Sequence, residues 1–339
     1  MVQSRRRAME DTQMADYPIY GDTSGTLSGN AHGRAQVLSG PDIPDGGPGF
    51  DIYGDAQAIT DQARGGNDVI FGPRLPGGGG SFANLYGDAL TISGSGRGGN
   101  DVIWCGDGPR NSAHGDARTL TDDARGGNDA LHGADGSINF NFLYGDAESL
   151  TGSARGGNDL LVAGRGAGNQ LFGDGIGMSD GTQGGNDLLY GFGGLLIGDA
   201  QFMGGNARGG NDTIIDLGNG ARMFGDAENA SGNAVCGDDR LVSGGGNDLM
   251  YGDASVKGAS VTTGADTFVF LPGSGQDTIG DFETGKDHID LTAYAPAGVH
   301  GVSALTLTSL AGATVIGLPG GGSITVQGST PVAGDILFA

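Results

Sequence analysis

Arg155-Gly156-Gly157-Asn158-Asp159-Leu160-Leu161 is one copy of a sequence word that recurs throughout the chain. Its core is Gly-Gly-Asn-Asp, followed in most copies by an apolar residue. The final aspartates of this first word, including two weaker copies that read Gly-Asp-Asp and Gly-Ala-Asp, are Asp68, Asp101, Asp129, Asp159, Asp187, Asp212, Asp239, Asp248 and Asp266. A second word, Gly-Asp-Ala or once Gly-Asp-Gly, contributes Asp55, Asp88, Asp116, Asp146, Asp174, Asp199, Asp226 and Asp253.

The two words keep a fixed distance. From each second-word aspartate to the next first-word aspartate the step is 13 residues, in eight consecutive cases from 55→68 to 253→266. Such a register identifies a repeat protein. Two apolar rows follow the same register: Ile70, Ile103, Leu131, Leu161, Leu189, Ile214, Leu241 and Phe268; and Ile52, Leu85, Ala113, Leu143, Leu171, Leu196, Met223 and Met250. Each lies in a short strand between Gly-rich turns, and stacked coils bury such rows as continuous ladders. This predicts an all-β fold, a parallel β-solenoid with two sheets, in which Gly-Asp-Ala opens an enlarged loop.

Composition restricts the partners. The 73 glycines have no period of three, which excludes collagen. Lys+Arg 17 against Asp+Glu 40 gives a formal charge of −23, which disfavours nucleic acid and anionic membranes and favours a hard divalent cation. No apolar run approaches the roughly 18 residues of a transmembrane segment. Cys105 and Cys236 lie in different repeats, and we do not expect a disulfide.

Leu241-Val242-Ser243-Gly244-Gly245-Gly246-Asn247-Asp248-Leu249-Met250 closely resembles the nonapeptide Gly-Gly-x-Gly-x-Asp-x-U-x, where U is aliphatic. That nonapeptide is typical of the RTX (hemolysin-type) family of secreted calcium-binding repeat proteins. The resemblance covers about residues 19–290. It implies a β-roll in which calcium lies between turns of successive coils, and bacterial export by type I secretion machinery.

Calcium prefers six to eight oxygen ligands, from carboxylates and backbone carbonyls, and glycines let a turn present such carbonyls. Carried over to this chain, the resemblance implies the calcium ligands Asp51, Asp68, Asp101, Asp129, Asp159, Asp187, Asp212, Asp239, Asp248, Asp266 and Asp277. The alternative is that these aspartates only cap turns. At the opposite edge the equivalent positions read Phe50, Ala83, Asn111, Asn141, Asn169, Gly194, Ala221 and Asp248. We therefore expect that edge to be poor in metal except near Asp248.

The role of the Gly-Asp-Ala aspartates stays open at this point. They could bind calcium as well. They could also pair with arginines nine residues later, Asp55 with Arg64, Asp88 with Arg97, Asp116 with Arg125, Asp146 with Arg155 and Asp199 with Arg208. A third possibility is a solvated arginine row that relieves anionic repulsion. Exposed pairs of this kind contribute only about 0–1 kcal/mol each.

The ends of the chain differ from the array. We expect a polar leader at 1–15, the RTX array at 16–290, and a C-terminal β cap with a type I secretion signal at 291–339. The first coil has Ala35 where an aspartate belongs, so we expect a degenerate coil. Residues 264–290 resemble the closing coils of serralysin-type proteases. The exposed N-terminal edge suggests calcium-dependent self-association, as a homo-oligomer or filament, through residues 16–50.

No catalytic motif lies outside the repeats, so we expect that the chain is not an enzyme. The favoured function is a secreted, extracellular or cell-surface calcium-binding protein with a structural, surface-layer or matrix role. The alternative is a secreted signalling or membrane-active RTX protein. A calcium-binding tail of an exported hydrolase is disfavoured because only about 18 residues precede the first repeat.

Overall fold

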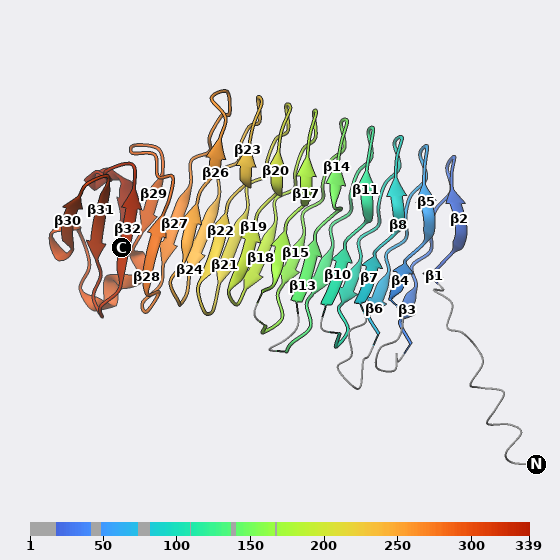
Figure 1. Ribbon diagram of the computed structural model, residues 1–339, viewed down its shortest axis with the longest axis horizontal. Helices are drawn as coiled ribbons and strands as arrows, with labels where there is room; N and C mark the ends of the chain where they lie inside the picture. The colour runs from blue at the N-terminus through green and yellow to red at the C-terminus, as the bar shows by residue number, and fades with distance from the viewer. Residues whose placement is uncertain (1–17, 42–48, 74–81, 109, 137–139, 167) are drawn as a thin grey trace, which may run out of the picture.

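The chain winds into an elongated solenoid of stacked coils, with the first coil at one end and the C-terminal segment at the other (Figure 1). This computed structural model describes residues 18–41, 49–73, 82–108, 110–136, 140–166 and 168–339. The expected leader, residues 1–15, lies outside the described residues. Nearly every regular element is a strand, so the predicted all-β parallel solenoid is confirmed.

Every coil but the last places one strand in each of three sheets, and the strands of successive coils pair in parallel. The first sheet runs through the strands that precede Gly-Asp-Ala: β1 (Ile19–Tyr20), β4 (Phe50–Tyr53), β7 (Phe82–Tyr86), β10 (Arg110–His114), β13 (Phe140–Tyr144), β16 (Gln170–Phe172), β19 (Gly194–Ile197), β22 (Ala221–Phe224), β25 (Leu249–Tyr251) and β28 (Gln276–Ile279). The second sheet runs through the strands that follow Gly-Asp-Ala: β2 (Thr23–Leu27), β5 (Ala56–Ile59), β8 (Ala89–Ile92), β11 (Ala117–Leu120), β14 (Ser149–Leu150), β17 (Gly175–Met178), β20 (Ala200–Met203), β23 (Ala227–Ala230) and β26 (Ala254–Lys257). The third sheet runs through the strands that mostly follow the first word: β3 (Val37–Ser39), β6 (Val69–Phe71), β9 (Val102–Trp104), β12 (Ala130–His132), β15 (Leu160–Val162), β18 (Leu188–Gly191), β21 (Thr213–Asp216), β24 (Arg240–Ser243), β27 (Thr267–Phe270), β29 (His288–Asp290) and β33 (Ile336–Leu337).

The two-sheet prediction was wrong, because the enlarged loop is itself a strand. Ile59 pairs with Ile92, and each of these side chains is fully buried. With Leu120 and small residues such as Ala63 they form a separate apolar cluster inside the lobe that the second sheet makes. The loop therefore has its own core, and this favours a third sheet over an irregular turn.

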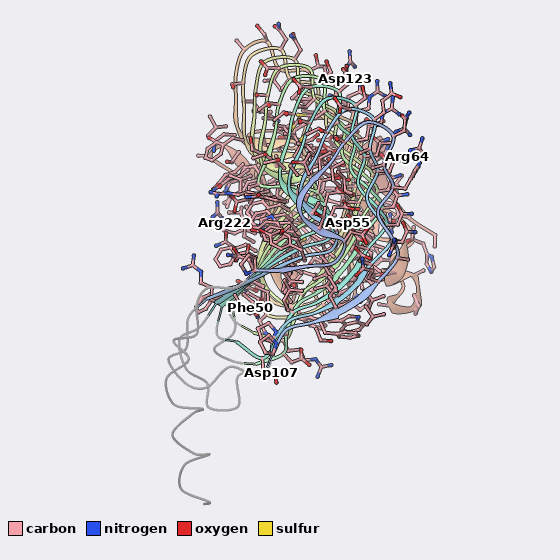
Figure 2. All side chains as sticks on the ribbon, turned by 90° about the vertical axis from the view of Figure 1, so that its right-hand side faces the viewer. Phe50, Asp55, Arg64, Asp107, Asp123 and Arg222 are labelled. Carbon is pink, nitrogen blue, oxygen red and sulfur yellow. The ribbon has the colours of Figure 1, made fainter. Side chains whose placement is uncertain are left out.

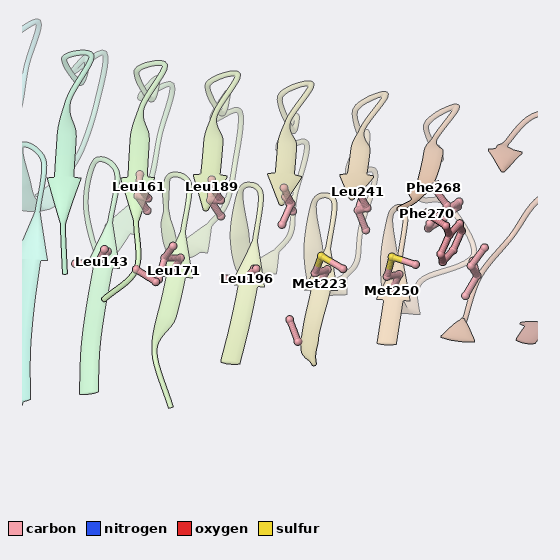
Figure 3. Packing of buried hydrophobic residues seen from close by; sticks show 14 of the residues in the cluster. Leu143, Leu161, Leu171, Leu189, Leu196, Met223, Leu241, Met250, Phe268 and Phe270 are labelled. Carbon is pink, nitrogen blue, oxygen red and sulfur yellow. The ribbon is translucent and has the colours of Figure 1, made fainter. Parts of the chain in front are cut away.

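The main core lies between the first and third sheets. Both predicted apolar rows lie in it, and every member is fully buried. Figure 3 shows one row through Leu143, Leu171 and Leu196 and the other through Leu161 and Leu189. Since each row has one side chain per coil, the core is continuous along the solenoid and cannot form from a single repeat.

A strand-rich segment follows the last coils. β30 (Thr306–Leu310), β31 (Ala313–Gly317) and β32 (Ser323–Gln327) form an antiparallel meander. β32 also pairs in parallel with β28, so the meander continues the first sheet. The short 3₁₀ helices are η1 (Thr292–Ala297), η2 (Val302–Ala304) and η3 (Ala333–Asp335). The first sheet therefore ends at β30 and not at β28.

We predict that adding one methyl group at Gly157 destabilises the protein. A Cβ there would overlap the carbonyl oxygen of Gly127 in the preceding coil, so Gly157→Ala should cost about 1–3 kcal/mol of unfolding free energy. Gly177→Ala is the matched control, because a Cβ at Gly177 meets open space. Urea unfolding at saturating calcium measures both. Equal stability of the two variants would contradict the close backbone stacking described here.

Candidate metal centre

Two corners of each coil bring aspartates into the interior. The Gly-Asp-Ala corner joins the first sheet to the second, and the Gly-Gly-Asn-Asp corner leads from the lobe back to the third sheet. Figure 2, viewed along the solenoid, shows Asp55 inside the molecule. We name these residues the aspartate file; its eight pairs, all exposed by 3% or less, are Asp55 and Asp68, Asp88 and Asp101, Asp116 and Asp129, Asp146 and Asp159, Asp174 and Asp187, Asp199 and Asp212, Asp226 and Asp239, and Asp253 and Asp266.

The first-word aspartates form a hydrogen-bonded ladder. The Asp129 backbone N–H donates to Asp159 Oδ1 at 2.7 Å, and the Asp159 N–H donates to Asp187 Oδ1 at 2.7 Å. The ladder uses one carboxylate oxygen per residue. The second oxygen is buried without a hydrogen-bond partner in every member of the row: Asp68, Asp101, Asp129, Asp159, Asp187, Asp212, Asp239 and Asp266.

The Gly-Asp-Ala aspartates close the lobe through the backbone. Asp146 Oδ1 accepts the N–H of Gly157, eleven residues later, at 2.8 Å, and Asp146 Oδ2 has no partner. Carboxylates of successive coils converge beside the preceding glycine. A Cβ on Gly156 would overlap both Asp146 Oδ2 and Asp174 Oδ1. At this point an unpaired oxygen of one coil, Asp146 Oδ2, therefore lies near an oxygen of the next coil, Asp174 Oδ1, that accepts the Gly185 N–H.

The interior disfavours charge on these groups. Burial and the neighbouring Asp55 together raise the pKa of Asp68 to about 7. Burial likewise raises the pKa of Asp239 to about 8 although backbone and side-chain hydrogen bonds oppose the shift. Burial and three neighbouring aspartates raise the pKa of Asp129 well above its ordinary value. The file accordingly needs either protons or a cation to neutralise it.

The donor set fits calcium. It consists of hard carboxylate oxygens, of which one per first-word residue is unpaired and buried, together with backbone carbonyl oxygens such as that of Gly87, which lies beside Asp68 Oδ2. One softer ligand interrupts it: Cys236 replaces a glycine between Asp226 and Asp253, and burial raises the pKa of its thiol. The Gly-Asp-Ala aspartates, whose role the sequence left open, belong to the same oxygen-lined file.

Residues 200–313 match the family described as Peptidase M10 serralysin C terminal. The matched domain is the Gly/Asp-rich repeat region. Residues 200–313 are thus similar to an RTX-type repeat region. The resemblance expected from the sequence is confirmed, and the matched region is the non-catalytic part of serralysin-type proteases. No curated protein matched the chain.

Within the described residues, no helix has the length and apolar character needed to cross a bilayer.

Three predicted ligands, Asp51, Asp248 and Asp277, lie outside the aspartate file. Asp51 is partly exposed on β4, where its carboxylate accepts hydrogen bonds from Asn84 Nδ2 at 2.8 Å and from the Tyr53 hydroxyl at 3.3 Å. The structure brings it together with these polar partners and not with the other aspartates. The reason is the two-residue strand period, which turns Asp51 to the outer face while Ile52 points inward.

The opposite edge has two parts. Asn111, Asn141 and Asn169 form a buried amide ladder, with Nδ2-to-Oδ1 distances of 3.0 and 2.9 Å, that needs no cation. Further along the array, Asp248 and Asp277 come together, because the Asp248 N–H donates to Asp277 Oδ1 at 2.9 Å. The buried Oδ2 atoms of both residues are unpaired. Burial raises the pKa of Asp248 to about 7.

Sequence reasoning missed Asp216 at this second cluster. Asp216 is fully buried at the end of β21, its Oδ2 is unpaired, and its charge contributes to the raised pKa of Asp248. Asp216 belongs to neither repeated word. A usable signal was its position opposite Gly191 and Ser243 in the third sheet, since a carboxylate there replaces small residues.

The expected Asp–Arg pairs are not present in the described part of the chain. Arg64 and its equivalents are exposed, whereas the Gly-Asp-Ala aspartates are buried and bond to backbone N–H groups. The arginine backbones form a ladder of their own, Arg64 with Arg97, Arg97 with Arg125 and Arg125 with Arg155. Loop closure uses Gly66 and its equivalents because their N–H groups, unlike an exposed guanidinium, reach the interior.

The two ends of the file contain other groups. In the first coil, Gln36 and not Ala35 lies opposite Asp68, since Val37 pairs with Val69. Gln36 Nε2 donates to Asp22 Oδ1 at 2.7 Å. In the last coils, Lys257 Nζ lies 2.9 Å from Asp253 Oδ2 and 2.9 Å from Asp281 Oδ2. Each end therefore provides a donor from the chain itself. Sequence reasoning missed Lys257, because its partner Asp281 departs from the 13-residue register.

We predict that the metal-free protein is most stable in acid. Unfolded aspartate has a pKa of about 3.9, whereas burial raises the pKa of folded Asp68 to about 7 and of Asp239 to about 8. The folded state thus keeps protons that the unfolded state releases. Its stability is fully present below about pH 4 and is lost as pH rises to about 8. Urea unfolding in chelator at several pH values measures this; stability that rises over this range would contradict it.

Proposed function

We propose that this chain is a secreted calcium-binding β-solenoid with a structural, surface-layer or matrix role, which folds on binding calcium outside the cell. The aspartate file supports this proposal most directly. Each of its coils buries two carboxylates and leaves oxygens without hydrogen-bond partners. Those residues would hold the ions, and calcium would supply the positive charge that the interior lacks. Asp248, Asp277 and Asp216 would form a smaller site at the other edge.

Calcium should then act as a folding ligand. Without it, stacked carboxylates repel one another and glycine-rich turns oppose folding through their entropy. Binding free energy becomes folding free energy in such proteins. We predict little strand signal at neutral pH in chelator and a cooperative gain at millimolar calcium, measured by circular dichroism during a titration. A strand signal that is already complete in chelator would overturn the proposal.

The file makes a distinct prediction about stoichiometry. Asp159→Asn should weaken or delete sites shared with neighbouring coils, because it removes a charge while keeping the shape of the side chain. Asp123→Asn is the matched control, since it removes the same charge from an exposed position. Asn169→Ala tests the other edge; it breaks the amide ladder and should lower stability without changing the number of ions bound. Calorimetric titration gives the stoichiometry. Equal losses from Asp159→Asn and Asn169→Ala would show that the edges are assigned wrongly.

The family match favours one second candidate, in which the array serves as the repeat tail of an exported peptidase. The chain printed here contains no His-Glu-x-x-His zinc motif. We therefore assign it a binding and folding role and no catalytic step. Calcium-dependent association through the N-terminal coil, residues 16–50, and type I export with a signal in 291–339 are parts of the same proposal.

A further inference from the structure

A row of arginines follows the outer surface of the Gly-Gly-Asn-Asp corner. Arg64, Arg97, Arg125 and Arg155 come from successive coils and pair as parallel bridges, so their backbones are about 4.8 Å apart. All four side chains are exposed, as is that of Arg208 two coils further on. Figure 2 shows Arg64 at the outer surface on one side of the lobe, with Asp55 in the interior. The guanidinium groups therefore face solvent in a straight line.

These arginines have no acidic partners among the described residues. The contrast with the other face of the solenoid is clear, because Arg118 pairs with Glu148 at 3.2 Å and Arg222 pairs with Glu228 at 2.8 Å. The chain has 40 acidic residues and 17 basic ones. A row of arginines therefore stays without acidic partners only where the fold keeps acidic side chains away from it. An acid does lie nearby in sequence, at Asp123, but it forms no ion pair with Arg125.

A row of asparagines runs beside the arginines. Asn67 Oδ1 accepts the backbone N–H of Asn100 at 3.1 Å, and Asn100 Oδ1 accepts that of Asn128 at 3.0 Å. The same bond continues through Asn158, Asn186 and Asn211. Because the oxygens accept within the ladder, each amide presents its N–H₂ group outward, and no hydrogen bond in the described structure uses it.

The two rows line one shallow groove. Its volume is about 410 Å³ at the coils of Arg64, Arg97 and Arg125, and Asn67, Asn100 and Asn128 line it as well. The charged and amide groups that it presents are hydrogen-bond donors. We name the arginines and asparagines together the donor strip: Arg64, Arg97, Arg125, Arg155, Arg208, Asn67, Asn100, Asn128, Asn158, Asn186 and Asn211.

The two rows also end together. Where Val235 and Thr262 replace the arginine, Asp238 and Ala265 replace the asparagine. Fold requirements do not explain this joint loss, because the ladder bonds persist: Asp238 still donates to Asn211, and Ala265 to Asp238. The strip is thus a bounded surface confined to the coils between Arg64 and Asn211.

We propose that the donor strip binds a single chain of an acidic polysaccharide. A surface made of donors fits carboxylate or sulfate oxygens, and guanidinium groups bind such anions in paired fashion. Five of the six coils between Arg64 and Arg208 carry an arginine, with Gln183 in the exception. This row of charge matches a polymer with about one anionic group per sugar ring. Nearby asparagine amides can donate to ring hydroxyl oxygens.

The overall charge favours this ligand over nucleic acid. Sixteen of the forty acidic residues lie in the aspartate file, so neutralising the file lowers the formal charge only from −23 to −7. A densely charged duplex would still meet repulsion outside the narrow strip. A single polysaccharide chain can lie along the strip alone. The inference does not depend on which cation neutralises the file.

The experiment uses the full chain, folded in millimolar calcium and checked by circular dichroism. The probe is immobilised chondroitin sulfate, which carries about one anionic group per sugar; desulfated chondroitin and uncharged dextran are the carbohydrate controls. The strip variant is Arg97→Gln with Arg125→Gln. The matched control is Arg118→Gln with Arg222→Gln, which removes the same charge from the other face. Oligo-dT provides the nucleic-acid arm.

We expect wild-type binding that weakens with salt and in the order chondroitin sulfate, desulfated chondroitin, dextran. The strip variant should lose about tenfold in affinity, since each exposed ionic contact contributes modestly, and the control variant should lose far less. Equal losses in both variants, no binding by folded wild-type protein, or tighter binding of oligo-dT would each overturn the proposal. Failure of calcium-induced folding would appear separately, in the circular dichroism.

Discussion

The constraint on which this structure depends is the stacking of like charges inside it. Parallel strands repeat at about 4.8 Å, and two carboxylates at that distance repel by about 3.5 kcal/mol at an effective dielectric constant of about 20. Each coil of the aspartate file adds two such groups with almost no exposure to water. The glycines around the file follow from it, because carboxylate or carbonyl oxygens already occupy the places where a Cβ would lie at Gly54 and Gly156. The buried acids of the file and the glycines packed against them therefore have one cause.

The coils at the two ends of the aspartate file have an adjacent coil on one side only. A cation between two coils can be shared by both, whereas an end coil offers half of that ligand set. At the first coil the Gln36 amide binds Asp22, and at the last coils the Lys257 ammonium binds Asp253 and Asp281. Burial alone would lower the pKa of Lys257, but Asp281 and Asp253 outweigh it and raise the pKa, so the ammonium keeps its charge. Each end of the file thus carries a donor from the chain itself.

The sequence predicted what is periodic. The 13-residue step located both aspartate rows, and the two apolar rows located the main core, because stacking repeats every inward position with the coil. It did not predict the second sheet, since Ile59, Ile92 and Leu120 lie in short segments that read equally well as turns. It also missed features that break the register: Gln36 is displaced by one residue from the expected Ala35, and Asp216 stands outside both words. Contacts such as that of Asp51 with Asn84 depend on which face of the sheet a side chain occupies, and the two repeated sequence words do not determine this.

The five-residue word Arg-Gly-Gly-Asn-Asp also explains why the interior and one surface are linked. In the coil of Asp159, the second glycine lies inside because a side chain there would overlap the preceding coil, and Asp159 turns inward to the file. Arg155 and Asn158, at the first and fourth positions, are left on the outside of the same corner. Any chemistry at those positions is then repeated at the coil spacing, because the buried aspartate fixes the register of every copy. A surface row with this spacing is consequently available to the chain without further structural change. Near Asp238 both outward residues are lost, whereas the inward aspartate persists. The two sides of the corner can therefore vary separately.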